Sequence, residues 1–161
     1  MNNQSVLTDI QKKRFSSIYF LHGKEPYFTE ALEKKFIADA IPVEEKDFNQ
    51  HVLYAKDHDL HTVLKLAQQF PMMGERQLIV VKEAHLYKNF DLLAAYAKSP
   101  MSQTVLVFSS KGKKLDARIE KKLDGVGFVI SNALYENKVP DWIATRVIER
   151  GLAIEPKASV L

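Results

Sequence analysis

The sequence has 161 residues and a formal net charge of +3, with 46% hydrophobic and 27% charged residues. This composition is ordinary for a soluble globular protein, and the length suffices for one domain with a hydrophobic core. The lack of cysteine excludes disulfides, thiolate zinc sites and cysteine nucleophiles, and fits the cytoplasmic location that we expect. No stretch approaches the roughly 20 apolar residues of a membrane helix, and the polar N-terminus lacks the apolar core of a signal peptide.

The first half of the chain alternates between strand and helix patterns. In chain order it predicts a strand, a helix, a weak strand and a second helix, at residues 18–21, 26–40, 45–49 and 60–67. Pro26 suits the first turn of the first helix, whose apolar residues recur every four positions. The second helix carries its apolar residues on one face.

The segment 70–83 reads F-P-M-M-G-E-R-Q-L-I-V-V-K-E. Residues 77–81 predict a buried strand, because their apolar residues run without a polar interruption. Met72 and Met73 lie between a proline and a glycine, which indicates a short loop. Large flexible apolar side chains on a loop either fold back into the core or bind a partner. Phe70 continues the apolar stripe of the preceding helix, so we expect it in the core.

The second half predicts a helix, a strand, a charged helix, a strand and a closing helix, at residues 91–98, 104–108, 115–123, 128–130 and 140–152. The repeated order of strand and helix predicts an α/β fold with a parallel sheet covered by helices on both faces and right-handed crossovers. Glu155 and Pro156 resemble the start of another helix close to the last residue, Leu161. We therefore expect one domain at 1–139, the start of a second at 140–161, and a longer natural chain.

The first strand ends in H-G-K-E-P, where a nucleotide-binding protein carries its phosphate loop. Such a loop needs several glycines and a final Ser or Thr, but here Gly23 stands alone and Lys24 is followed by Glu25. The strand at 77–81 is followed by Lys82, which would repel the magnesium ion that an acidic residue holds. Two elements of ATP hydrolysis are missing, so we expect no cofactor and no intrinsic catalysis.

Two histidines are candidates for a metal site. His58 and His61 could share a helix face as metal ligands, but two imidazoles without a third strong ligand bind weakly. A solvated helix start capped by Asp57 or Asp59 is the favoured interpretation. The sequence contains no nucleophile elbow and no carboxylate pair typical of acid–base catalysis.

The segment 111–122 carries six basic and two acidic residues. Its basic side chains could contact phosphates or an acidic partner, through Lys111, Lys113, Lys114 and Arg118. The run lacks interleaved aromatic residues for base stacking. We therefore favour a solvated helix with an acidic residue near its start and lysines near its end.

Several segments resemble the bacterial DNA polymerase III delta subunit. I-Y-F-L-H-G-K-E at 18–25 is similar to the opening Y-F-L-x-G-x-E of that family, and K-L-D-A-R at 114–118 to its K-L-D-x-R. F-P-M-M-G-E-R-Q-L-I-V-V at 70–81 is similar to P-F-F-G-E-R-R-L-V-V-V and is the most specific match. W-I at 142–143 with G-L at 151–152 resembles the start of its second domain.

The resemblance implies an AAA+-like fold that does not hydrolyse ATP, in a clamp loader subunit that binds the beta sliding clamp and helps to open the ring. It places Met72 and Met73 where the family inserts an apolar pair into the clamp, with Phe70 at the edge of the contact. The usual pair is Phe or Leu-Phe, and methionine fills a similar volume without the aromatic packing. The family also implies further domains that bind the other loader subunits, DNA contact through the assembled complex, and membership of a DNA-directed DNA polymerase (nucleotidyltransferase) holoenzyme.

Two other functions are open on the residues alone. One is a small α/β enzyme with a nucleotide or phosphate ligand, which would have to bind it despite the short loop at Gly23. The other is a DNA-binding module that uses Lys111 to Lys122, which predicts a steep dependence of DNA affinity on salt.

We predict that the chain has negligible affinity for Mg-ATP and does not hydrolyse it. The reason is the single-glycine loop at Gly23 together with Lys82 at the metal position. Isothermal titration calorimetry with Mg-ATP measures this directly, and micromolar binding would show that the loop still serves a nucleotide.

Overall fold

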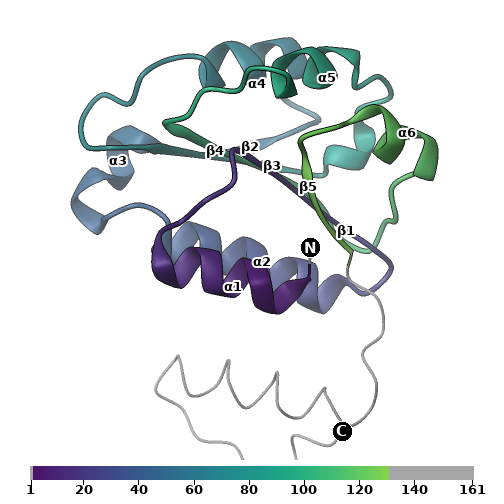
Figure 1. Cartoon of the computed structure of the whole chain (residues 1–161), viewed down its shortest axis with the longest axis horizontal. Coiled ribbons are helices and arrows are strands. Elements are labelled where there is room, and N and C mark those ends of the chain that lie inside the picture. Colours follow the sequence, from purple (N-terminus) through teal and green to yellow (C-terminus); the bar gives the residue numbers. More distant parts are fainter. Residues whose placement is uncertain (1, 131–161) are drawn as a thin grey trace, which may run out of the picture. The chain divides into compact units, whose positions relative to one another are not determined.

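The computed structural model describes residues 2–130 as one α/β unit (Figure 1). Its five strands are all parallel and lie in the order β2-β3-β4-β1-β5. They are β1 (Ile18–His22), β2 (Gln50–Tyr54), β3 (Gln77–Lys82), β4 (Thr104–Ser110) and β5 (Gly127–Ile130). The sheet confirms the fold class that the alternation of elements predicts.

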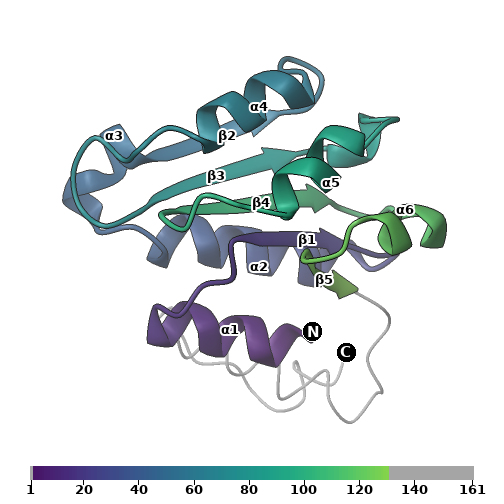
Figure 2. The same ribbon diagram turned by 45° about the horizontal axis from the view of Figure 1, so that its top comes forward.

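Helices cover both faces of this sheet (Figures 1 and 2). One face carries α1 (Asn3–Lys12) and α2 (Pro26–Asp39), and the other carries α4 (Leu60–Ala67) and α5 (Asp91–Ala97). The short elements are α3 (Lys46–Asn49), α6 (Ala117–Lys122) and the 3₁₀ turns η1 (Val43–Glu45) and η2 (Ala84–Leu86). No helix within residues 2–130 is long and apolar enough to cross a membrane.

The three central strands carry the core. Every residue of β1 and β4, and all of β3 except Lys82, is buried. A strand with helices on both faces buries both sets of its side chains, which is why these segments read as continuous apolar runs. The edge strand β2 is only partly buried and alternates instead.

The predicted strand at 45–49 is wrong. These residues form η1 and α3, and the strand begins only at Gln50. An edge strand with exposed Val52 and Tyr54 lacks the continuous apolar run by which the central strands were recognised. The predicted helix at 115–123 is confirmed but shorter, because Asp116 caps it by accepting from the Arg118 N–H and so fixes its start at Ala117.

Helix α1 was not predicted at all. It is mostly polar, and Asn2 and Ser5 form a reciprocal cap at its start. Only Val6, Leu7 and Ile10 are buried. The predicted helix at 140–152 and the domain boundary at 139–140 lie outside the described residues.

Candidate functional site

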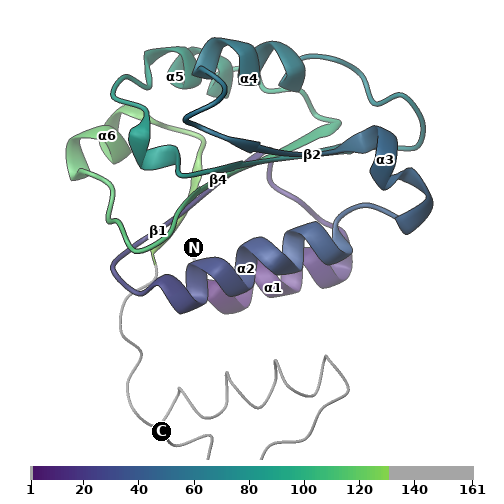
Figure 3. The same cartoon turned by 180° about the vertical axis from the view of Figure 1, so that it is seen from behind.

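The methionine pair lies on the loop between α4 and β3, residues 68–76, which we call the methionine loop. It runs beside α3 at the edge of the sheet where the parallel strands begin (Figures 1 and 3). The side chain of Met72 is 78% exposed and that of Met73 is 49% exposed. The methionines are therefore not core residues.

The expectation that Phe70 lies in the core is wrong, because Phe70 is 75% exposed. Helix α4 ends at Ala67. Beyond that residue the helical period no longer decides which side chains face the sheet, so the apolar stripe stops before Phe70.

A buried asparagine holds the backbone of the methionine loop. Asn49, the last residue of α3, is completely buried. Its Oδ1 accepts a hydrogen bond of 3.0 Å from the Met72 N–H, and its Nδ2 donates to the Met73 carbonyl. One side-chain amide thus satisfies a donor and an acceptor of two consecutive residues, while their side chains point outward.

A second buried polar group closes the base of the loop. Gln77 Nε2 donates to the carbonyls of Leu66, at 3.1 Å, and Gln69, at 2.8 Å. Thr104 Oγ1 donates to the Ala67 carbonyl at 2.7 Å. These contacts give partners to carbonyls in and just after the last turn of α4, and they hold that end against the start of β3 and β4.

The second half of the loop is constrained at two further points. Gly74 adopts a φ of 73°, and a Cβ there would meet the carboxylate of Glu45. The guanidinium of Arg76 lies 4.9 Å from the centre of the Phe15 ring. The exposed side chains of the loop are therefore carried on a backbone that is fixed at several points.

The segment that contacts the loop adds exposed apolar residues of its own. Val43 in η1 is 78% exposed, and Phe48, the neighbour of Asn49 in α3, is 48% exposed. We call these two residues, together with Phe70, Met72 and Met73, the apolar surface. Exposed apolar residues on adjoining segments make this edge a candidate site for a partner. Sequence reasoning missed Phe48 and Asn49, because it assigned them to a strand.

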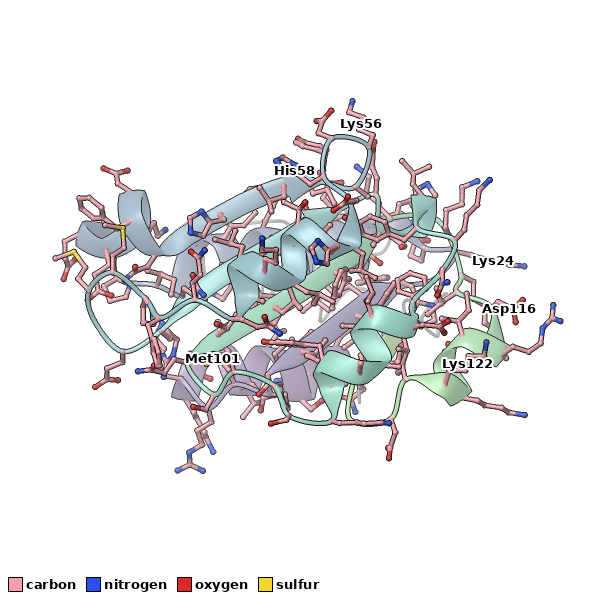
Figure 4. All side chains as sticks on the ribbon, turned by 90° about the horizontal axis from the view of Figure 1, so that it is seen from above. Lys24, Lys56, His58, Met101, Asp116 and Lys122 are labelled. Atoms are coloured by element: carbon pink, nitrogen blue, oxygen red, sulfur yellow. The ribbon has the colours of Figure 1, made fainter. Side chains whose placement is uncertain are left out.

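The basic candidates lie at the opposite edge, where the strands end. Figure 4 shows Lys24, Asp116 and Lys122 together at one end of the molecule. Lys111, Lys113, Lys114 and Arg118 follow β4 and are exposed, which confirms a solvated segment. Lys111 Nζ lies 3.6 Å from Glu30, and Arg118 lies 3.3 Å from Asp116. The structure thus separates these residues from the methionine loop.

The protein's own carboxylates occupy the edge where a nucleotide fold binds phosphate. Glu25 caps the start of α2 by accepting from the Tyr27 N–H at 3.1 Å. Lys82, at the metal position, pairs with the buried Glu33 at 3.2 Å. A carboxylate at the helix N-terminus repels an incoming phosphate, so this edge is poorly suited to a nucleotide.

His22, at the end of β1, connects this strand to the segment that follows β4. It is fully buried, its Nδ1 accepts from the Leu115 N–H at 3.0 Å, and the adjacent Gly23 N–H donates to the Lys113 carbonyl at 2.9 Å. Glu120 Oε1 lies 3.1 Å from Nε2 without hydrogen-bond alignment. Burial, helped by the charge of Lys114, lowers the pKa of His22 to about 4, and protonating Nδ1 would also break the bond to Leu115.

The two histidines near α4, His58 and His61, lie at its capped start. Asp59 caps that helix by accepting from the Thr62 N–H at 2.8 Å, as expected for one of the two aspartates. The His58 carbonyl accepts from the Tyr87 hydroxyl at 2.7 Å. Within residues 2–130, no three His, Cys, Asp or Glu side chains are grouped to hold a metal ion.

Comparison with known proteins decides the family. The family model for the DNA polymerase III delta subunit matches residues 19–131. The chain belongs to this family. It is 31% identical over 128 residues to DNA polymerase III subunit delta of Bacillus subtilis (strain 168), covering 73% of the chain and 36% of that protein.

Two solved structures extend this comparison. The chain is similar to the Bacillus subtilis DNA clamp loader delta protein, with a TM-score of 0.78, 26% identity, and coverage of 98% of this chain and 50% of that one. A DNA polymerase III gamma subunit-related protein of Thermotoga maritima shares the fold alone, with a TM-score of 0.54, 11% identity, and coverage of 96% and 57%. The fold is AAA+-like, and the chain spans half or less of its Bacillus relatives.

In this delta-family chain, we predict that His22 makes stability depend on pH. The unfolded histidine binds a proton below its ordinary pKa of 6.5, whereas the folded one binds it only near pH 4. The part of the free energy of unfolding that comes from neutral His22 is thus complete above pH 6.5 and is lost as pH falls toward 4. Between pH 7 and pH 5 this loss is about 2 kcal/mol.

The variant His22→Asn keeps an acceptor for the Leu115 N–H but cannot titrate. We expect urea unfolding of the wild type to lose about 2 kcal/mol more than the variant between pH 7 and pH 5. His51, whose pKa burial also lowers, is present in both proteins and cancels. Equal losses in the two proteins would mean that His22 is protonated in the folded state.

Proposed function

We propose that this chain is the clamp-binding part of a DNA polymerase III delta subunit, which binds the beta sliding clamp and helps to open the ring during DNA replication without hydrolysing ATP itself. The observation that carries the proposal is the exposed methionine pair on a fixed loop. The resemblance of residues 70–81 to the family's segment supports the proposal, because it implies that Met72 and Met73 stand at the positions of the clamp-inserting pair.

The chemistry of the apolar surface supports this assignment. Met72 and Met73 present two long apolar side chains, and Phe70 adds an exposed ring two residues before them. Side chains of this size gain most when a partner's pocket removes them from water. A fixed backbone lowers the ordering cost of binding, which offsets part of the affinity that methionine loses relative to an aromatic residue.

The residues at the opposite edge, where the strands end, support a subunit that does not hydrolyse ATP itself. Its nucleotide position holds Glu25 and the Lys82–Glu33 pair, so ATP hydrolysis falls to other loader subunits. We infer that domains beyond this part of the protein join those subunits. A contact with phosphates or with an acidic partner in the assembled cytoplasmic complex would use the exposed Lys111, Lys113, Lys114 and Arg118.

We predict that replacing both Met72 and Met73 with Ser weakens binding to the beta sliding clamp of the same organism by at least about a hundredfold, or about 2.7 kcal/mol. The fold is expected to survive, because exposed side chains contribute little to the core. Surface plasmon resonance on immobilised clamp measures the affinity, and thermal unfolding checks the fold.

The matched control replaces Leu86 and Leu92, which are 48% and 49% exposed, with Ser. This double variant removes as many exposed apolar side chains from elsewhere on the molecule and should bind like the wild type. If the methionine variant also binds like the wild type, the clamp site lies elsewhere. If it unfolds, its side chains support the core.

A further inference from the structure

We propose that Asn49 is a positioning residue that sets the methionine loop in its clamp-binding conformation, an inference that rests on the proposed function. Asn49 contributes no exposed surface of its own. It lies 23 residues before Met72 and reaches the loop only because of the fold. Its role would be to fix the backbone from which Met72 and Met73 project.

The register of the sheet brings Asn49 to the loop. Gln50, the next residue, pairs with Leu78 in the parallel ladder between β2 and β3. The end of α3 therefore lies beside the start of β3, where the methionine loop arrives. The Lys46 side chain holds the other end of α3 by donating to the Ala38 carbonyl at 2.9 Å.

The chemistry of the contact is specific to a side-chain amide. The Met72 N–H needs an acceptor and the Met73 carbonyl needs a donor. Asn offers both from one rigid planar group, whereas ionised Asp offers acceptors alone and Leu offers neither. Both hydrogen bonds are part-buried, and a backbone group that is kept from water without a partner is costly, so a loop that loses Asn49 will turn these groups toward water and move the methionines.

The expected effect on binding follows from the population of the competent loop. The apparent dissociation constant rises in inverse proportion to the fraction of molecules in the competent conformation. If Asn49→Ala leaves about a tenth of the molecules with the loop in place, clamp affinity falls about tenfold. Met72 and Met73 remain present and chemically unchanged in this variant.

A double-mutant cycle on the 161-residue chain tests the proposal. Clamp affinity is measured for the wild type, Asn49→Ala, the Met72→Ser/Met73→Ser variant, and the combination of all three changes. We expect Asn49→Ala to cost about tenfold alone and less than twofold when the methionines are already Ser, because Asn49 acts through them. The Leu86→Ser/Leu92→Ser background, which keeps the methionines, should show the full tenfold effect.

A second variant and a direct probe keep the test decisive if Asn49→Ala does not fold. Asn49→Asp retains the shape and the acceptor, and its carboxyl regains a donor when protonated. Its clamp affinity relative to wild type at the same pH should recover as pH falls from 8 to 5, since burial raises the pKa of such a group. Amide hydrogen exchange of the wild type, which does not depend on either variant, should show protection at Met72.

The outcomes separate this inference from the proposed function. If the methionine variant binds normally, the proposed clamp site is wrong. If that variant is impaired but the Asn49 variants are folded and bind like wild type, only the positioning role is overturned. The positioning role is also overturned if the losses of clamp-binding free energy add fully in the cycle. A Met72 amide that exchanges freely in the wild type overturns it as well.

Discussion

The exposure of the two methionines depends on how the backbone polar groups of the methionine loop find hydrogen-bond partners. The methionine loop leaves α4 and enters β3 across the end of a buried sheet, where unpaired polar groups are costly. Asn49 and Gln77 meet that requirement with side-chain amides that are themselves buried. Because the polar backbone is fixed inward, the apolar side chains of Met72 and Met73 are left outside. The loop therefore presents apolar side chains to solvent, which is the feature on which the proposed clamp site rests.

The parallel sheet divides the molecule into two edges with different chemistry. The edge at the start of the strands carries the apolar surface, and the edge at their ends carries buried His22, the Lys82–Glu33 pair and the exposed basic residues. In α/β folds the second edge is where ligands commonly bind. Here the carboxylate of Glu25 accepts from an N–H at the start of α2, and the carboxylate of Glu33 pairs with Lys82. The chain thus keeps the architecture of a nucleotide-binding protein, while the surface that we propose for the clamp lies at the other edge.

The sequence predicts the central strands well, since burial on both faces forces uninterrupted apolar runs such as Gln77–Lys82. It predicts poorly whatever depends on a partner distant in the chain. Nothing in the local pattern around 45–49 indicates that Asn49 reaches Met72, and helix α1 was missed because its polar sequence buries only one narrow stripe. Phe70 was misplaced because a helical period was extended past the end of α4. The two methionines were found from their Pro and Gly neighbours and from family resemblance, and their exposure confirms that they are not core residues.

We propose that the methionine side chains themselves enter the clamp. The chain contains four methionines, so ¹³C labelling of their ε-methyl groups gives few, resolvable NMR signals. Half-buried Met101, which is labelled in Figure 4 and packs against the core, serves as an internal reference. On titration with the sliding clamp, we expect the Met72 and Met73 methyl signals to shift or broaden while that of Met101 changes little beyond the general broadening of a larger complex. A complex that forms while the signals of Met72 and Met73 change no more than that of Met101 would contradict the account.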